Sequence, residues 1–207
     1  MTTLYCDKSR LPLRREHDFY PTDRGTVTAA LRAFLAHWDH EPDALPGAPP
    51  LRTALDPGAG AGVWGDVLRA FRPTVRVWGV ERRPTPRPPG YERWIEDDFL
   101  QVAMDLSNPF DLVLGNPPYR DAERFIERAL ACVRVGGHVL FLLRLAFLEG
   151  QARRDGLYAR HPLRWLWVCS KRPSFQPDGK SSPTAYGVYL WQKGFHGEPT
   201  IGYLRHD

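Results

Sequence analysis

A glycine-rich segment, Asp56–Gly62, has the composition of a loop that holds a small-molecule ligand. It reads Asp-Pro-Gly-Ala-Gly-Ala-Gly, follows a short apolar run and precedes a stretch with helical spacing. Glycines let the backbone approach a ligand closely, and amide N–H groups at the start of a helix attract negatively polarised groups. We therefore expect this segment to lie against a ligand, the alternative being a tight turn without one.

An acidic residue, Glu81, stands at the end of the next strand-like run. A carboxylate roughly 20 positions after a glycine loop is placed to accept hydrogen bonds from ribose hydroxyls. The glycine segment lacks the lysine of a phosphate-binding Walker loop, which argues against a nucleoside triphosphatase. A nicotinamide-dependent enzyme remains consistent with these residues.

The segment Asn116–Tyr119 separates these options. It reads Asn-Pro-Pro-Tyr and follows the apolar run Phe110–Gly115. Here the sequence resembles the class I amino-methyltransferases, most closely the adenine-specific DNA methyltransferases of bacteria and phages, whose motif is Asp/Asn-Pro-Pro-Tyr/Phe/Trp. The segment Asp18–Thr22 (Asp-Phe-Tyr-Pro-Thr) precedes the glycine loop as in those enzymes. The resemblance extends from Asp18 to Gln192.

The resemblance implies S-adenosyl-L-methionine as cofactor and four catalytic residues, Asn116, Pro117, Pro118 and Tyr119. The side-chain oxygen of Asn116 and the carbonyl of Pro117 would accept the two N–H groups of the adenine amino group, which frees the nitrogen lone pair. The prolines stiffen the loop, so these acceptors are preorganised. Tyr119 offers a flat face for stacking on the base.

Roles in binding the cofactor also follow from the resemblance, and they fall on Tyr20, Pro21, Thr22, Asp56, Gly58, Gly60, Glu81, Asp98, Phe99 and Asn116. The first three would lie near the methionine end. Asp56 and the glycines would hold the amino acid and sulfonium, and Glu81 the ribose. Asp98 would accept from the cofactor's adenine amino group, with Asp97 as the alternative. The chain departs from the family at Asp23, where proline is expected, which puts the role of Thr22 in doubt.

The polar loop Ser170–Thr184 carries the expected contacts to nucleic acid, which are Lys171, Arg172, Phe175 and Lys180. By the resemblance, Phe175 would hold the target base opposite Tyr119, while the cations contact phosphates. The alternative is an ordinary solvated basic loop. Its composition also predicts a loop that is mobile until nucleic acid binds.

Strands and helices are expected to alternate along the chain, which indicates a doubly wound α/β sheet with ligands beyond the carboxyl ends of its strands. The expected strands are Arg52–Asp56, Val75–Glu81, Arg93–Glu96, Phe110–Gly115, His138–Leu145, Leu163–Cys169 and Ala185–Gln192. The expected helices are Val63–Phe71, Asp121–Val135 and Ala146–Arg160. The resemblance implies the Rossmann-like class I methyltransferase fold, a mostly parallel, seven-stranded sheet with a final antiparallel strand.

The length of 207 residues predicts a single domain. We expect residues 1–50 to form an N-terminal segment with the Asp-Phe-Tyr-Pro-Thr motif, and residues 51–207 the catalytic core, without a large separate recognition domain. The formal net charge of +4 mildly favours an acidic partner such as nucleic acid. The cysteines and histidines show no metal-ligand spacing, and there is no apolar span or secretory signal. We therefore expect a cytoplasmic protein with no metal and no membrane contact.

The sequence thus predicts an enzyme that methylates the exocyclic amino group of adenine in DNA after flipping the base out of the duplex. Three alternatives stay open. An RNA adenine-N6 methyltransferase would be identical at the pocket. A protein glutamine-N5 methyltransferase would also present a planar amino group, although such enzymes usually carry an upstream helical domain. The third is a catalytically silent module that binds cofactor or nucleic acid.

Overall fold

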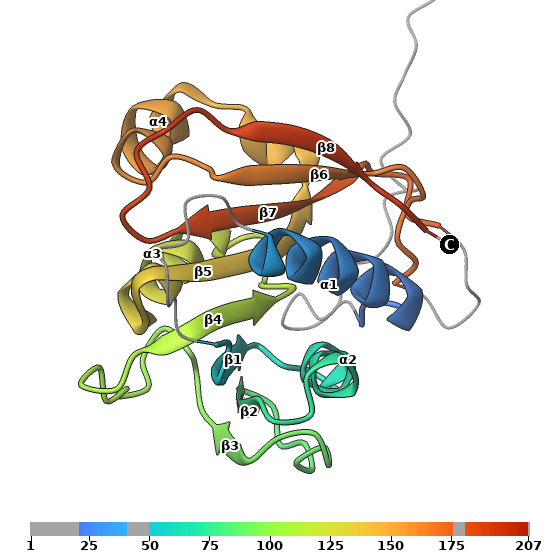
Figure 1. Cartoon of the computed structure of the whole chain (residues 1–207), viewed down its shortest axis with the longest axis vertical. Coiled ribbons are helices and arrows are strands. Elements are labelled where there is room, and N and C mark those ends of the chain that lie inside the picture. The colour runs from blue at the N-terminus through green and yellow to red at the C-terminus, as the bar shows by residue number, and fades with distance from the viewer. Residues whose placement is uncertain (1–20, 41–49, 176–180, 207) are drawn as a thin grey trace, which may run out of the picture.

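The computed structural model describes residues 21–40, 50–175 and 181–206. An extended β-sheet runs through the molecule, and helices pack against it (Figure 1). In chain order the elements are α1 (Arg24–Asp39), β1 (Thr53–Pro57), α2 (Val63–Phe71), β2 (Arg76–Glu81), β3 (Arg93–Glu96), β4 (Phe110–Gly115), α3 (Ala122–Cys132), β5 (Val133–Arg144), η3 (Leu145–Leu148), α4 (Gln151–Arg153), η4 (Arg154–Tyr158), β6 (Trp165–Cys169), β7 (Tyr186–Gln192) and β8 (Thr200–Leu204).

The sheet has eight strands in the order β3-β2-β1-β4-β5-β7-β6-β8. β7 runs antiparallel to both of its neighbours, and the other paired strands are parallel. This confirms the expected doubly wound, mostly parallel sheet with an antiparallel strand late in the chain. The chain builds outward from β1 to β3 and then returns to place β4 beside β1. The strand order therefore reverses between β1 and β4, which is where such sheets bind ligands.

Alternate residues of each central strand face two separate hydrophobic cores. In β5, Leu140 and Leu142 join the cluster that contains α1 and α2. Phe141 and Leu143 point the other way, into the cluster that contains α3. Every residue of β4 is buried, as expected for a parallel strand covered on both faces.

Helix α1 was not expected from the sequence. Asp23 caps it, because its carboxylate accepts hydrogen bonds from the backbone N–H of Thr26 at 2.8 Å and from the Thr26 hydroxyl at 2.7 Å. Residues at helical spacing, including Val27, Leu31 and Phe34, are fully buried against the sheet. Asp23, which departs from the expected motif, thus begins this helix.

The expected helix Asp121–Val135 is shorter in the structure. α3 ends at Cys132, and β5 already begins at Val133, which pairs with Phe110 of β4. Gly136, a glycine with φ 74° of the kind that often ends a helix, lies instead inside β5, four residues after the end of α3. The prediction was wrong here because the buried, β-branched Val133 gains a strand partner, which helical periodicity alone cannot reveal.

Two further differences lie late in the chain. The expected helix at residues 146–160 is present only from 151 to 160, where a π-helical turn at 154–158 lies between two short α-helical stretches. Residues 145–148 form a separate 3₁₀ turn, and Gly150, with φ 110°, lies between the two segments. An eighth strand, β8, pairs in parallel with β6. The sequence does not indicate this strand, because Ile201 and Tyr203 are exposed and the strand lies at the edge of the sheet, without the apolar run of a core strand.

No helix in the described part of the chain is long and apolar enough to cross a membrane. Within the same residues, no group of histidine, cysteine and acidic side chains is arranged to hold a metal ion. Cys132 and Cys169 are buried free thiols, whereas Cys6 lies outside the described residues. Burial raises the pKa of the Cys169 thiol to about 12, so it stays protonated.

A buried carboxylate, that of Asp111, ties the beginnings of three strands together. It accepts hydrogen bonds from the backbone N–H groups of Arg52 at 2.8 Å and Thr53 at 3.0 Å. Its other oxygen accepts from Nε of Arg134 at 2.7 Å. The carboxylate therefore joins β1, β4 and β5 at the edge opposite the strand ends that bind ligands.

We predict that Asp111→Ala lowers the free energy of unfolding by about 3 kcal/mol, because it leaves buried backbone donors and Arg134 without their partner. Urea denaturation of the purified protein measures the change. Asp105→Ala is the matched control, since Asp105 is exposed and bonds only within its own loop. Equal midpoints for the two variants would contradict the role of Asp111.

Candidate active site

The glycine loop after β1 has a backbone that only glycine adopts readily. Gly58, Gly60 and Gly62 have φ values of 76°, 60° and 81°. The N–H groups of Gly58 and Ala59 donate to the carbonyl of Val80 at 2.7 and 3.0 Å, so the loop folds across the end of β2. α2 begins directly after it at Val63. The sequence prediction of a strand, a glycine loop and a helix is confirmed.

Glu81 lies at the carboxyl end of β2 and fastens this loop. Its Oε2 accepts a hydrogen bond from the N–H of Gly60 at 2.7 Å. Its Oε1 accepts from the backbone N–H and from Nε of Arg83, at 3.0 and 2.8 Å. The carboxylate is buried, and Oε1 already accepts two hydrogen bonds, so Oε2 is the oxygen that keeps a lone pair with which to accept a hydrogen bond from a ligand hydroxyl.

Asp56 is completely buried at the end of β1. Its Oδ2 accepts a hydrogen bond from the Tyr91 hydroxyl at 2.5 Å, whereas its Oδ1 has no partner among the described residues. Burial raises the pKa of Asp56 to about 7, the Tyr91 hydrogen bond opposes this, and Glu81 adds to it. A buried carboxylate oxygen without a donor is costly, so Oδ1 is suited to a donor group of a ligand.

Tyr91, which was not among the expected site residues, holds Asp56 in place. Its hydroxyl accepts a hydrogen bond from the N–H of Gly65 at 3.0 Å. A Cβ placed on Gly62, Gly65 or Gly79 would come within 2.8, 2.4 or 2.9 Å of Tyr91 atoms. The ring therefore fits against glycines of the loop, of α2 and of β2. One aromatic residue in a proline-rich connector offers no sequence signal for this role.

Asn116 follows β4, the strand beside β1. Its Nδ2 donates to Oγ1 of Thr22 at 3.2 Å, and its side chain interacts with the Tyr119 hydroxyl, which lowers the pKa of that hydroxyl against the larger effect of burial. A Cβ on Gly115, the last residue of β4, would lie 2.9 Å from Oδ1 of Asp56, and one on Gly58 would lie 3.9 Å from Cδ of Pro118, so the glycine loop and the loop after β4 lie side by side. The structure thus brings Thr22 to Asn116, with Pro21 directly before it, whereas Tyr20 lies outside the described residues.

Tyr119 is half-buried beside two residues that the sequence did not single out. Its ring centroid lies 5.8 Å from that of Tyr186, and the Arg144 guanidinium lies 5.0 Å from it. Burial, with a further contribution from Tyr186, raises the pKa of Tyr119 well above its ordinary range. Arg144 ends β5 and Tyr186 begins β7, so both come from strand ends at the same edge of the sheet. A charged residue closing an apolar strand is the only sequence signal for Arg144.

The two acidic candidates for the cofactor's adenine lie after β3, next to Glu81. The N–H of Asp97 donates to the Glu81 carbonyl at 3.1 Å. Asp97 is exposed, whereas Asp98 is half-buried and its carboxylate accepts a backbone N–H at 2.9 Å. Phe99 is buried with its ring centroid 5.2 Å from that of Phe125. Both acidic side chains therefore lie after β3, as expected, and both remain candidates for the contact to the adenine amino group of the cofactor.

The residues after β6 reach the same edge of the sheet. The N–H of Ser174 donates to Oδ2 of Asp23 at 3.1 Å, which ties this segment to the start of α1. Lys171 and Arg172 are exposed, as expected for residues that contact phosphates. Lys180 lies outside the described residues.

Phe175 does not have the exposed ring that we expected of a residue stacking on a base. It is buried, with its centroid 5.1 Å from that of Tyr186, and belongs to the core that includes α1. The polar composition of the loop predicts an exposed aromatic ring at this position. Phe175 is buried instead because its ring packs against the ring of Tyr186. In this structure Phe175 supports Tyr186, which in turn contacts Tyr119.

No protein-family model matches the chain. The chain is similar to an uncharacterized MG259 homolog of Mycoplasma pneumoniae, with 31% identity over 110 residues, covering 46% of this chain and 24% of that protein. It is also similar to the ribosomal RNA small subunit methyltransferase C of Serratia proteamaculans, with 30% identity over 121 residues, covering 52% of this chain and 35% of that protein. The chain thus spans 24% and 35% of the length of these two relatives.

Solved structures establish the fold. A class I S-adenosylmethionine-dependent methyltransferase, itself a putative one, from Listeria monocytogenes superposes with a TM-score of 0.61 at 15% identity, covering 91% of this chain and 66% of that chain. The type IIG restriction endonuclease BpuSI gives 0.60 at 16% identity, covering 87% and 26%. A chain of a type I R-M system gives 0.59 at 16% identity, covering 87% and 43%. The fold is therefore the Rossmann-like fold of class I methyltransferases.

We predict that Asp56 makes the free protein less stable as the pH rises. Its pKa is raised from 3.8 to about 7 in the folded state. The folded state therefore holds a proton that the unfolded chain releases, and the stabilisation, fully present below pH 3.8, is lost as the pH rises through about 7. The expected loss is a few kcal/mol.

Urea unfolding of the wild type and of Asp56→Asn between pH 4 and pH 8 measures this effect. The asparagine variant cannot titrate at this position, so the difference in unfolding free energy between the two proteins should shift across this range. A difference that stays constant with pH would show that Asp56 is ionised throughout. Asp105→Asn is the control, because that side chain is exposed and bonds within its own loop.

Proposed function

We propose that this chain is an S-adenosylmethionine-dependent methyltransferase that methylates the exocyclic amino group of adenine in DNA. The observation that carries the proposal is the placement of Asn116. Its side-chain amide donates a hydrogen bond to Thr22 directly after β4, in a loop that lies beside the glycine loop of β1. The class I fold puts ligand binding at this reversal of strand order.

The residues around the glycine loop fit the cofactor. The unpartnered Oδ1 of Asp56 suits the donor of its amino acid end, and the positive-φ glycines leave the loop backbone accessible. Glu81 lies where a ribose would be held, and Asp98 or Asp97 lies one strand further, where an adenine amino group would be held. When bound, the cofactor supplies the methyl group as an electrophilic sulfonium.

The Asn-Pro-Pro-Tyr loop would hold the amino group that receives the methyl. Because the Nδ2 of Asn116 faces Thr22, its Oδ1 is directed elsewhere and can accept from the target N–H. The carbonyl of the buried Pro117 is the second acceptor. Fixed acceptors align the nitrogen and free its lone pair, and this positioning supplies much of the rate acceleration. A base inside a duplex must be flipped out to reach them.

DNA is the proposed substrate because chains from restriction-modification proteins share the fold over 87% of this chain. The ribosomal RNA methyltransferases among the curated relatives favour a second candidate, in which the same pocket methylates a base in RNA. Transfer of a radiolabelled methyl group to DNA and RNA oligonucleotides of identical sequence decides between them. Labelling of neither would remove both candidates.

We predict that Asn116→Ala slows methyl transfer about 100-fold or more, since it removes one of the two acceptors for the amino group. Affinity for S-adenosylhomocysteine should change little, because Asn116 grips the target nitrogen. Single-turnover methylation and calorimetry measure the two effects. Asn108→Ala, in an exposed loop, is the control. Near wild-type turnover by Asn116→Ala would exclude the mechanism.

A second prediction concerns the ribose. Glu81→Ala should weaken binding of S-adenosylhomocysteine by about 1–3 kcal/mol, because hydrogen bonds to a charged acceptor are lost. Calorimetry at fixed pH measures the dissociation constant. Glu92→Ala, an exposed acid at the other end of the neighbouring strand, should bind as the wild type does. An unchanged dissociation constant for Glu81→Ala would show that a residue other than Glu81 holds the ribose.

A further inference from the structure

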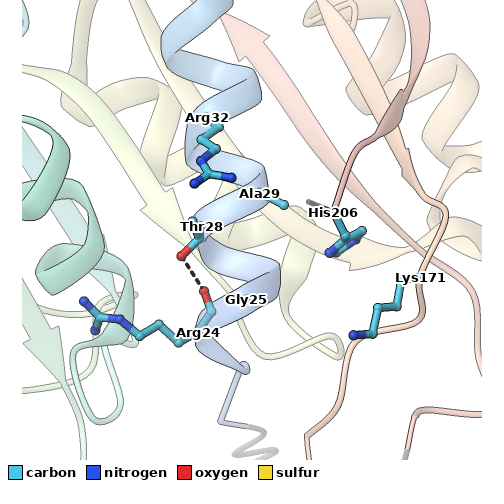
Figure 2. A pocket seen from close by; sticks show the side chains of 7 residues that line it. All are labelled: Arg24, Gly25, Thr28, Ala29, Arg32, Lys171 and His206. Carbon is cyan, nitrogen blue, oxygen red and sulfur yellow. Dashed lines mark hydrogen bonds between the residues drawn. The ribbon is translucent and has the colours of Figure 1, made fainter.

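A basic pocket of about 380 Å³ lies beside the first half of α1, outside the residues that fit the cofactor. Figure 2 shows its lining, which consists of Arg24, Gly25, Thr28, Ala29, Arg32, Lys171 and His206. These residues come from α1, from the segment after β6 and from the segment after β8. They include three strongly basic side chains and no carboxylate.

The cations are arranged around the start of the helix. Lys171 and His206 extend toward α1 from the C-terminal segments, and Arg24 extends from the first turn on the other side of the helix (Figure 2). Neither Arg24 nor Lys171 forms an ion pair with another described residue. The Nε2 of His206 is buried and has no hydrogen-bond partner among the described residues. The pocket therefore carries positive charge that the described part of the fold does not neutralise.

The helix terminus itself does not supply this charge. The Asp23 carboxylate already accepts the Thr26 N–H, which offsets the positive end of the helix dipole. Binding of an anion would therefore depend on the side-chain cations. Arginine and lysine are the residues that contact phosphate oxygens most often, and cations lining a hollow concentrate anionic ligands.

One hydrogen bond joins the candidate active site to the residues just before α1, and a second joins those residues to the segment that carries Lys171. Arg24 comes two residues after Thr22, whose Oγ1 accepts from Nδ2 of Asn116 at 3.2 Å. Lys171 comes three residues before Ser174, whose N–H donates to Asp23 at 3.1 Å. A polyanion in the pocket would therefore lie close to the Asn-Pro-Pro-Tyr loop. A nucleic acid meets this condition, because each nucleotide beside the reacting base carries a phosphate.

We infer that this pocket binds backbone phosphates of the nucleic-acid substrate next to the target base, with Arg24 and Lys171 as the principal contacts. The inference rests on the proposed function for the identity of the polyanion. Phosphate contacts fix orientation and carry no sequence information. The pocket therefore positions the strand, and the base is recognised at Asn116.

The test uses the full chain and a fluorescein-labelled DNA duplex that contains adenine. In the double variant Arg24→Glu/Lys171→Glu, the dissociation constant measured by anisotropy should rise at least 10-fold. The dependence of log K on log salt should become shallower by about 2, which corresponds to two lost phosphate contacts. An RNA of the same sequence should lose affinity to a similar extent, because both backbones carry the same phosphates.

The matched control, Arg76→Glu/Arg154→Glu, has the same change in charge. Both arginines are exposed and lie outside the pocket, one on β2 and the other on η4. It should keep the wild-type salt slope and bind within about twofold. Arg24→Glu places an acid in the first turn of α1, where it favours the helix, so unfolding and calorimetric cofactor affinity should stay as in the wild type.

The outcomes separate this inference from the proposed function. If the wild type methylates the duplex while the double variant keeps its affinity and salt slope, the pocket is not a phosphate site. The same conclusion follows if the control loses as much affinity as the double variant, or if the wild type binds neither nucleic acid. If the double variant binds weakly with a shallower slope but the wild type transfers no methyl group, the pocket is a phosphate-binding site and the proposed methyltransferase function is wrong.

Discussion

Parallel pairing between β1 and β4 is the constraint on which the rest of the site depends. Ala54 and Leu55 lie opposite Leu112 and Val113, so both strands end at the same edge of the sheet. Because of this pairing, Asp56 and Gly115, the last residue of β4, come into close contact although they are far apart in the sequence. The glycine loop must then turn across β2, where Val80 and Glu81 receive its N–H groups.

The same pairing buries Asp56 between loops that leave it little water. Among the described residues its carboxylate has the Tyr91 hydroxyl as its one donor, and burial makes its charged form costly. Tyr91 is in turn fixed by close approach to glycines, so neither group can rotate away without disturbing the loop. Burial of the Asp56 carboxylate lowers the stability of the folded protein, but it leaves a hydrogen-bond acceptor that is already oriented. Such an arrangement is typical of functional sites.

Local patterns predicted most of the sheet and the glycine loop, because buried strands and positive-φ turns leave direct signals in the sequence. Periodicity shows which face of a segment is apolar, but it does not show the partner of that face. It therefore missed that Val133 pairs as a strand and that Phe175 packs on Tyr186. The residues from Asp56 to Tyr119 that the resemblance marked stand at or just after strand ends, but their supports, Tyr91 among them, come from tertiary packing.

Asp23 shows why the site should respond to contacts made outside it. One carboxylate caps α1 through Thr26 and also accepts the N–H of Ser174. The neighbouring Thr22 holds the amide of Asn116. The start of α1, the segment after β6 and the amide of Asn116 therefore form one hydrogen-bonded unit. Under the proposed function, energy from binding a strand at this unit would fix the position of Asn116, since alignment of reacting groups draws on contacts remote from the reacting atoms.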